Sequence, residues 1–553
     1  MKMPSVMKHN FARIPRTEIN RSKFDRSHGL KTAFDSGYLV PVEVQEVLPG
    51  DEVEYDIASL MRMAPVVTCP MDNVFLDFQA FFVPNRLIWT NFVKMMGERV
   101  NPKDSIDYQV PVINSGESGF AVGSLADYFG IPPNVPNLDV SCLPFRAYAK
   151  IFDDWYRDEG LQDSIIQSTD DLGDSNGTIV WNTLLRRGKR SDYFTRALTA
   201  PQRGVGVELP LGTTAPVMGN GMALGLTNGT VSAGVTISDY QSATLQYLDA
   251  GALGKDVGTA GFTGAHATGL LPAKAAGVVT DATKSGLVAD LTGATAATIN
   301  SLRLAFAVQR ILEKDARQGV RYCEILRGHF LTVSPDARLQ RSEYLGGSSE
   351  LVNFNPVLQT SGTVDGGTPQ ANLTANPKAV GRLRFKKAFT EHGWLMILAN
   401  VRADLNYQQG LNRMFSRRTR YDFFWPSLQN LGESAVKNKE IFCQGKSVLD
   451  DDGNIVDEMP FGYQEAWAEY RYAPSVITGK MRSGVTGSLD IWHLAQHFQT
   501  LPTLSAEWIQ DTPPLDRIIA VEGEPQCFMD CYFKCNWTRP MATFSVPGLI
   551  DHL

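Results

Sequence analysis

The run VFLDFQAFF (74–82) decides the fold class. In an extended chain every second side chain points to the same face. The apolar side chains at the even-numbered positions of this run share one face: Val74, Leu76, Phe78, Ala80 and Phe82. Asp77 and Gln79 fall on the opposite face, and Pro84 ends the run. This period of two predicts a β-strand with a buried face.

The same alternation recurs elsewhere along the chain. The run YLVPVEV (38–44) places Tyr38, Val40, Val42 and Val44 on one face and is followed by the turn-forming residues LPGD (48–51). Strand-like runs return at 382–389, 394–402 and 527–535. The 48 Gly and 30 Pro favour short strands and turns over long helices. We therefore predict a mainly β protein, a sandwich closed by its N- and C-terminal halves.

Helical patterns are few. A spacing of 3.6 residues predicts helices over 143–159 and 300–317, a short amphipathic helix over 86–98, and another candidate over 491–498.

The charge of the chain is distributed unevenly. The net charge is −7, but residues 1–31 carry eight Lys or Arg against two acids, a balance of +6, which leaves about −13 for the remainder. A basic arm on an acidic body favours contact between the arm and a polyanion. The candidate nucleic-acid residues are Arg13, Arg16, Arg21, Lys23 and Arg26. A solvated basic tail remains an open alternative.

Residues 204–299 differ in composition from the rest of the chain. They contain no Arg, no Trp and only nine charged residues, and consist largely of Gly, Ala, Thr, Val and Leu. The segment lacks large core-forming side chains but is too apolar for a typical disordered linker. We expect an insertion that becomes ordered by packing against copies of itself.

Targeting and redox signals are weak. No run approaches the roughly 18 apolar residues needed to span a bilayer, and the N-terminus has no apolar signal-peptide core. The seven cysteines are odd in number and scattered, which fits neither a disulfide framework nor a zinc site. We expect a chain made in a reducing cytoplasm. Cys527, Cys531 and Cys535 share one face of a predicted strand, and we interpret them as small core residues.

Signals for catalysis are also weak. His493 and His497 would lie one helical turn apart, but the glutamate of the zinc-protease motif and a third ligand are missing. The carboxylates of a predicted helix are crowded together, which favours a solvated face: Asp153, Asp154, Asp158 and Glu159. We expect neither a cofactor nor a catalytic site. The alternatives are a carbohydrate-active β-sandwich using Asp153 or Glu159, and a secreted adhesive, lectin-like protein.

Arginines and aromatic residues gather in one segment. Its basic members are Arg413, Arg417, Arg418 and Arg420, and its aromatic members are Tyr421, Phe423, Phe424 and Trp425. Such a mixture suits single-stranded nucleic acid, because bases stack on rings while guanidinium groups pair with phosphates. It equally suits a subunit interface in which each guanidinium pairs with an acid.

Several longer stretches occur in a fixed order. They are FFVPNRLIW (81–89), LPFRAYAKIFDDWYRDEGLQ (143–162), DYFTRALTAPQRG (192–204), EKDARQGVRYCEILRGHF (313–330), SPDARLQRSEYLGG (334–347), EHGWLMILANVRADLNYQQGLNR (391–413), RYDFFWPSLQNLGESAVKNKEIF (420–442) and VPGLIDH (546–552). They are distributed from residue 81 to residue 552, on both sides of 204–299. In sequence and order they resemble the major capsid protein family of the Microviridae, small single-stranded DNA bacteriophages, and most closely the gokushovirus type.

The resemblance implies an eight-stranded antiparallel jelly roll with long inter-strand loops, a few short helices and one large insertion. It implies assembly into a T=1 icosahedral shell around circular single-stranded DNA. The implied partners are a small basic DNA-binding protein, minor virion proteins and a bacterial surface receptor, with synthesis in the host cytoplasm and no membrane insertion. In that family the insertions gather at the threefold axes as protrusions, which makes them candidates for host attachment.

On this basis we divide the chain into four parts: a basic arm (1–35), a first part of the jelly roll (36–203), the insertion (204–299) and a second part of the jelly roll (300–553). The loops 86–160 and 313–380 are rich in large apolar and Arg residues outside any alternating pattern. We expect both loops to be buried between subunits and not packed on their own sandwich.

Overall fold

The computed structural model describes residues 20–166, 168–171, 183–204, 206–207, 217–219, 225–226, 235–236, 287–289, 299–317, 322–331, 340–521 and 523–544. The chain divides into two compact units, one formed by Met1–Arg203 with Glu313–Leu553 and the other by Gly204–Leu312. In the second unit β8 (Val217–Gly219) pairs antiparallel with β11 (Leu287–Ala289), and β9 (Gly225–Leu226) pairs with β10 (Val235–Thr236).

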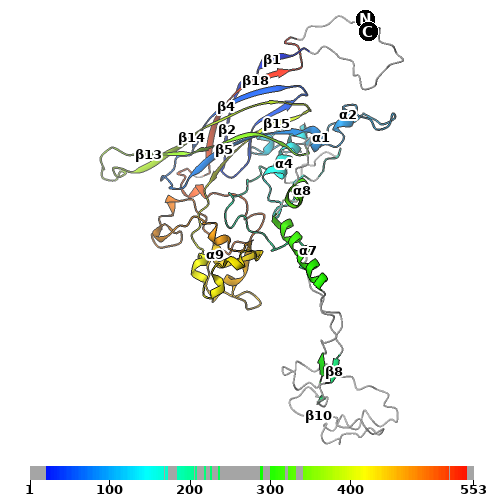
Figure 1. Cartoon of the computed structure of the whole chain (residues 1–553). Helices are drawn as coiled ribbons and strands as arrows, with labels where there is room; N and C mark the ends of the chain where they lie inside the picture. Colours follow the sequence, from blue (N-terminus) through cyan, green and yellow to red (C-terminus); the bar gives the residue numbers. More distant parts are fainter. Residues whose placement is uncertain are drawn as a thin grey trace, which may run out of the picture. The chain divides into compact units, whose positions relative to one another are not determined.

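Two antiparallel sheets form the framework of the first unit (Figure 1). The first sheet has the order β1-β18-β4-β14-β13, and β2 also pairs with β18. Its strands are β1 (Ser22–Asp25), β2 (His28–Phe34), β4 (Glu52–Met63), β13 (Asn353–Leu358), β14 (Leu373–Ala388) and β18 (Cys527–Arg539). The second sheet has the order β12-β5-β15-β3, with β3 (Val40–Val47), β5 (Val74–Pro84), β12 (Glu343–Leu351) and β15 (Gly393–Ala403). The prediction of a mainly β fold with few helices is confirmed.

The main core lies between the facing sides of these sheets. The predicted apolar face of β5 is fully buried there, from Val74 to Phe82. On β18 buried and exposed residues alternate, and Cys527, Cys531 and Cys535 lie in the same core, as predicted. Burial raises the pKa of the Cys527 thiol above the usual range, so this thiol stays protonated at neutral pH.

A second core covers the other face of the β12-β5-β15-β3 sheet. Phe81 and Val83 of β5 pack there against α4 (Leu143–Trp155), one of the predicted helices, and against Trp89 and Phe92. The expectation that loop 86–160 is buried between subunits is therefore wrong for much of the loop, because its large apolar residues form a core within its own chain.

The predicted helix over 86–98 consists of two short pieces, α1 (Asn85–Ile88) and α2 (Phe92–Met95). The chain becomes extended at Trp89 between them, where the indole Nε1 donates to Asp171 at 2.6 Å. Nearby lie α3 (Leu125–Tyr128) and the paired strands β6 (Val112–Asn114) and β7 (Asp139–Ser141).

A third core lies in an excursion that carries α9 (Asn438–Ile441), away from the sheets in Figure 1. Around it lie the antiparallel strands β16 (Glu433–Lys437) and β17 (Pro460–Glu465). The remaining elements are α7 (Ile299–Arg317), close to the predicted helix 300–317, α8 (Tyr322–Phe330), and short 3-10 helices at Arg413–Ser416, Arg420–Asp422, Pro426–Leu428, Val456–Glu458, Ala468–Tyr470, Gly479–Met481, Asp490–Trp492 and Leu515–Arg517.

The predicted helix over 491–498 is wrong. Only Asp490–Trp492 forms a single 3-10 turn. Beyond it the amide of Leu494 donates to the Asp72 carboxylate, and that of Ala495 donates to Nδ1 of His493 at 3.1 Å. Because these amides bond to side chains, they are not available to the carbonyl groups one helical turn back.

Candidate interaction surfaces

The arginine–aromatic segment, residues 413–425, contains two arginines that bind to acids of the same chain. The guanidinium of Arg413 lies 3.6 Å from the Glu440 carboxylate and 3.8 Å from that of Glu469. Burial alone would lower the pKa of Arg413, but attraction to these two carboxylates outweighs it and raises that pKa. Arg413 thus remains charged in its half-buried position.

Arg417 is held in a similar way. Its Nη2 lies 3.2 Å from Glu469, and its guanidinium carbon lies 4.3 Å from the centre of the Tyr470 ring. The side chain of Arg417 is only 11% exposed. Arg413 and Arg417 therefore fasten the segment to its own subunit.

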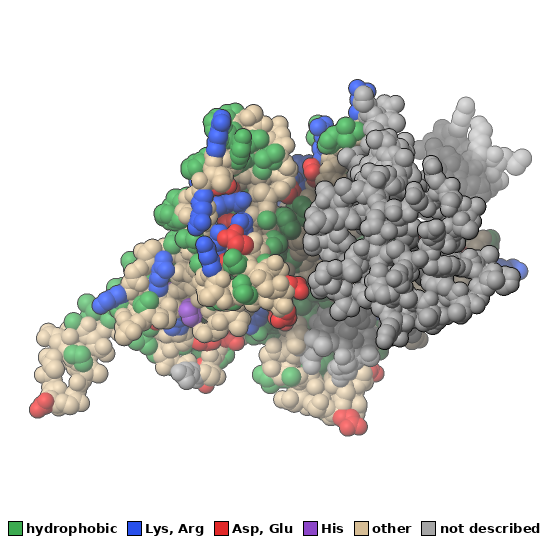
Figure 2. All heavy atoms as spheres, turned by 90° about the horizontal axis from the view of Figure 1, so that it is seen from below, with side chains coloured by type: hydrophobic (Ala, Val, Ile, Leu, Met, Phe, Trp, Pro, Cys, Tyr) green, Lys and Arg blue, Asp and Glu red, His purple; other side chains and the backbone are tan. Residues whose placement is uncertain are grey.

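The other members of the segment remain on the surface. Arg418 and Arg420 are exposed. The Arg420 guanidinium lies 4.7 Å from the Trp425 ring, whose Nε1 donates to the Arg420 carbonyl at 3.0 Å. Phe415 and Tyr421 beside them are each 69% exposed. Figure 2 shows basic side chains among hydrophobic ones on one face of the molecule. This exposed part is available to a partner subunit or to nucleic acid, the two alternatives left open above.

The basic arm is described only from residue 20, so Arg13 and Arg16 lie outside the described residues. Arg21 Nη2 donates to the Gly50 carbonyl at 2.6 Å. Arg26 Nη2 donates to Oε1 of Gln45 at 2.6 Å, and its guanidinium carbon lies 4.8 Å from the Trp537 ring. Lys23 is exposed on β1. Arg21 and Arg26 thus have structural contacts, while Lys23 points to solvent.

The acidic cluster of α4 is not the solvated face that the sequence suggested. Asp153 is buried, and its carboxylate accepts hydrogen bonds from the Ser164 hydroxyl and from the amide of Ile165 at 3.1 Å. The side chain of Asp154 is 4% exposed and binds Lys150 at 2.9 Å. Burial of these carboxylates is tolerated because Lys150, Ser164 and Ile165 supply their hydrogen bonds.

The last two acids of the cluster do not combine with Asp153 in one cleft. Asp158 accepts a hydrogen bond from the Gly160 amide at 2.9 Å, and both Asp158 and Glu159 line an open hollow of about 740 Å³ on the surface. Asp153 is absent from the lining of that hollow. The pair of facing carboxylates that glycoside hydrolysis requires is therefore not formed by Asp153 and Glu159.

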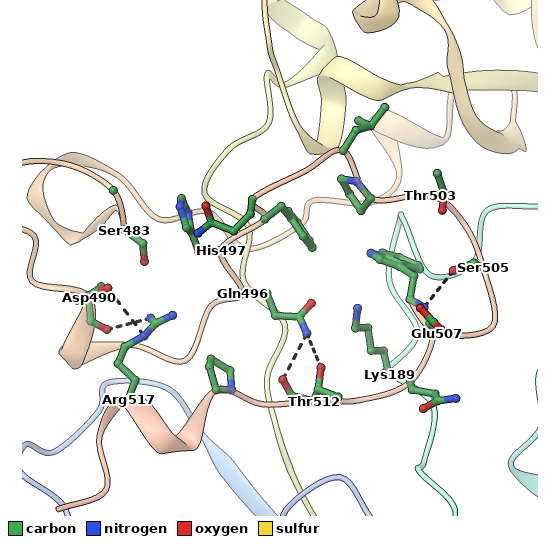
Figure 3. A pocket seen from close by; sticks show the side chains of 18 residues that line it. Lys189, Ser483, Asp490, Gln496, His497, Thr503, Ser505, Glu507, Thr512 and Arg517 are labelled. Atoms are coloured by element: carbon green, nitrogen blue, oxygen red, sulfur yellow. Dashed lines mark hydrogen bonds and ion pairs between the residues drawn. The ribbon is translucent and has the colours of Figure 1, made fainter. Parts of the chain in front are cut away.

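The histidine pair does not converge on one point. Nε2 of His493 is hydrogen-bonded to the Met481 carbonyl, and His493 is buried. His497 instead lines a pocket of about 850 Å³, shown in Figure 3. Below its ring in that view lie Asp490 and Arg517, joined in an ion pair of 3.8 Å. Within the described residues, His, Cys, Asp and Glu side chains form no group of three or more that could hold a metal ion.

The outer face of the β18-β4-β14 sheet, the side turned away from the main core, was not among the sites predicted from the sequence. Alternate residues of these strands are exposed or half-buried there, and Arg62, Lys378 and Tyr532 are among the exposed ones. The signal was present in the alternation of each strand. The sequence does not show which three strands lie side by side.

None of the helices within the described residues combines the length and hydropathy required to cross a bilayer. A family model described as "Capsid protein (F protein)" matches residues 12–549. The chain is 41% identical to capsid protein VP1 of Chlamydia phage 1, covering 99% of each chain. It is 41% identical to capsid protein VP1 of Bdellovibrio phage phiMH2K and 38% identical to that of Spiroplasma virus 4, covering in both cases 98% of this chain and 97% of the relative. The resemblance to gokushovirus-type Microviridae is confirmed.

Proposed function

The chain belongs to the F-protein family of phage capsid proteins, and from this premise we propose that it assembles into a T=1 icosahedral shell enclosing a circular single-stranded DNA genome. Membership of the family makes the chain a structural protein of the virion and a subunit of a homo-oligomeric shell. The observation that carries the proposal is the match to three phage capsid proteins over 98–99% of this chain.

The strand order supports the shell architecture. We propose that β2, β3, β4, β5, β12, β14, β15 and β18 form one eight-stranded jelly roll. In such a fold two four-stranded antiparallel sheets face each other, and the chain connects their strands in a Greek-key path. The sheet orders β2-β18-β4-β14 and β3-β15-β5-β12 fit that path, since the first and last strands in sequence, β2 and β18, are neighbours.

The insertion supplies the proposed attachment function. Residues 204–299 would project at the threefold axes, with their apolar residues packed between copies, and would present the tip to the host receptor. Few charges mean little repulsion where identical segments meet. A projection of this composition would expose an apolar patch unless a partner covered it, and a symmetry axis supplies that partner.

We also propose the division of the chain into four parts. These are a basic arm (1–35), two parts of the jelly roll (36–203 and 300–553) and the insertion (204–299). The arm would face the interior and meet the genome together with a small basic DNA-binding protein. The remaining partners would be minor virion proteins and a bacterial surface receptor, with synthesis in the host cytoplasm.

Virions purified from a producing culture test the proposal directly. Electron cryomicroscopy should give a T=1 shell with density at the threefold axes connected to residues 203 and 300. DNA extracted after nuclease treatment of the intact virions should resist exonuclease and be cut by a single-strand-specific endonuclease. A shell of another triangulation number, or particles that contain no DNA, would contradict it.

A further inference from the structure

The outer face of the β18-β4-β14 sheet, together with the adjoining strand β2, carries an excess of positive charge. Its basic side chains are Lys31, Arg62, Lys378, Arg382, Arg384, Lys386 and Lys534. Its acidic side chains are Glu52, Glu54, Asp56 and Asp530. Seven cations against four anions leave +3 on this face, although the whole chain carries −7. A local excess of this kind attracts a polyanion.

Two of these cations stand opposite each other without a neutralising partner. Arg62 on β4 and Lys378 on β14 are direct partners in the antiparallel register, and both are exposed. Neither forms an ion pair with a carboxylate in the described part of the chain. Like charges directly opposite each other destabilise a sheet. A bound anion between them would remove that cost.

Next to Arg62 and Lys378, arginine side chains outnumber their acidic partners. Arg382 and Arg384 both bind the single carboxylate of Asp56, at 3.2 and 2.7 Å. One carboxylate neutralises one guanidinium, so one positive charge is left over. The side chains of Arg382 and Arg384 are 58% and 59% exposed, which leaves them accessible to a ligand.

Aromatic rings lie in the same rows across the sheet. Phe528 is the register partner of Arg62, and Tyr532 is the partner of Ala58, which in turn faces Arg382. The two aromatic residues are 44% and 54% exposed. Four residues of strand separate them by about 13 Å. Two parallel rows therefore each offer a cation and an exposed ring.

We propose that this outer face is a contact surface for the packaged single-stranded DNA, with phosphates on Arg62, Lys378 and Arg382 and bases stacked on Phe528 and Tyr532. The inference rests on the proposed enclosure of a DNA genome and assigns the surface that meets it. Unpaired bases stack on aromatic side chains while basic groups follow the backbone, whatever the base sequence. A second copy packed through the same face would require acids facing the opposed cations, and the face itself supplies too few.

Ultraviolet cross-linking of intact virions tests the assignment without any mutation. After irradiation, nuclease digestion and proteolysis, mass spectrometry should find nucleotide adducts on the β18 peptide, at Phe528 or Tyr532. Virions that contain DNA and yield no adduct on this strand would overturn the inference.

Charge variants give a second, independent measurement. The unassembled subunit with R62Q and K378Q should bind an oligothymidylate with a salt dependence weaker by about 1.4 in the slope of log K against log salt, since each phosphate that is no longer neutralised reduces the slope by roughly 0.7. Replacing Tyr532 by Ala should weaken binding by roughly tenfold. The matched control, K446Q with R482Q, removes two cations that are exposed in the third-core excursion and should leave the slope unchanged.

The outcomes separate this inference from the proposed function. Wild-type virions without DNA would refute the enclosure of a genome. Wild-type virions with DNA, combined with an unaltered slope for the folded R62Q/K378Q subunit, would refute only the assigned surface. A variant subunit that folds and binds DNA normally but no longer assembles would show that the face joins copies of the chain instead.

Discussion

The carboxylate of Asp154 on α4 accepts hydrogen bonds from both the backbone amide and the hydroxyl of Ser342, at 2.8 and 2.9 Å. Ser342 is fully buried and directly precedes β12. Nε1 of Trp155 also donates to the Ser342 hydroxyl oxygen, at 3.0 Å. Because 188 residues of sequence separate Asp154 from Ser342, this contact joins the second core to the edge strand of the second sheet.

Replacing Asp154 by Ala should reduce the free energy of unfolding of the unassembled subunit by about 3 kcal/mol, since buried donors lose a charged acceptor. Urea unfolding followed by tryptophan fluorescence measures the change. The control is Glu117→Ala, which removes an exposed carboxylate and should change the stability by less than about 0.5 kcal/mol. Equal stabilities for the two variants would contradict the structural function of Asp154.

The stability should depend on pH through His28 and Glu43, which join β2 to β3. Their side chains lie 2.8 Å apart, and the hydrogen bond to Glu43 raises the pKa of His28, against the opposing effect of burial. In the unfolded chain the pKa of histidine is about 6.5. The protonated pair therefore stabilises the fold fully below about pH 6.5, and this stabilisation is lost as pH rises through the higher folded-state pKa.

Unfolding midpoints of the wild type should accordingly fall between about pH 6 and pH 8 by more than those of H28Q. Glu43→Gln removes the partner carboxylate and should reduce the pH dependence to the same degree. If the unfolding midpoint of H28Q falls over this pH range by as much as that of the wild type, the His28–Glu43 pair does not cause the pH dependence.

Arg417 and Arg418 are adjacent in sequence but should respond differently to substitution. Arg417→Gln leaves the nearly buried Glu469 without its closest cation and should cost about 3 kcal/mol of subunit stability. Arg418→Gln removes an exposed charge and should leave the stability within about 0.5 kcal/mol of the wild type. Denaturant unfolding of both variants measures this difference. Equal losses of stability would mean that the contact with Glu469 does not stabilise the subunit.

The basic arm should separate into two functional groups. Neutralising Arg13, Arg16 and Lys23 should lower the DNA content of particles or their stability at raised salt, because exposed cations neutralise phosphates. Neutralising Arg21 and Arg26 should instead destabilise the subunit, since these side chains bind Gly50 and Gln45. DNA content per particle and urea unfolding distinguish the two effects. Unchanged packaging and salt response in the first variant would argue against an interior arm.

Replacing residues 220–290 with a short Gly/Ser linker tests the attachment function of the insertion. We expect particles that assemble but fail to adsorb to host cells. The control replaces the exposed β13–β14 turn, residues 361–368, with Gly/Ser of equal length and should adsorb normally. Adsorption at the wild-type rate by the linker variant would leave the insertion without a receptor function.

Much of the fold could be predicted from local patterns. The period of two in 74–82 and in 527–535 identified which side chains enter the core, because a strand places alternate residues on opposite faces wherever it lies. The quoted motifs identified the family, since their order and spacing are specific. Helices at 143–159 and 300–317 followed from the spacing of apolar residues, which is equally local.

Only the tertiary structure determined which polar groups are buried and which charges are paired. The sequence shows four acids crowded around 153–159, but the burial of Asp153 and Asp154 depends on Ser164 and Ser342. In the sequence, Arg413 and Arg417 cannot be told apart from Arg418. In the structure they differ from it because they form ion pairs with Glu440 and Glu469. The opposed pair Arg62 and Lys378 exists only because β4 and β14 are neighbours. The sequence by itself determined which side chains share a strand face, because periodicity is local. It also identified the family, through motifs in a fixed order. Charge pairing depends on residues brought together from distant parts of the chain, so only the folded chain determines it.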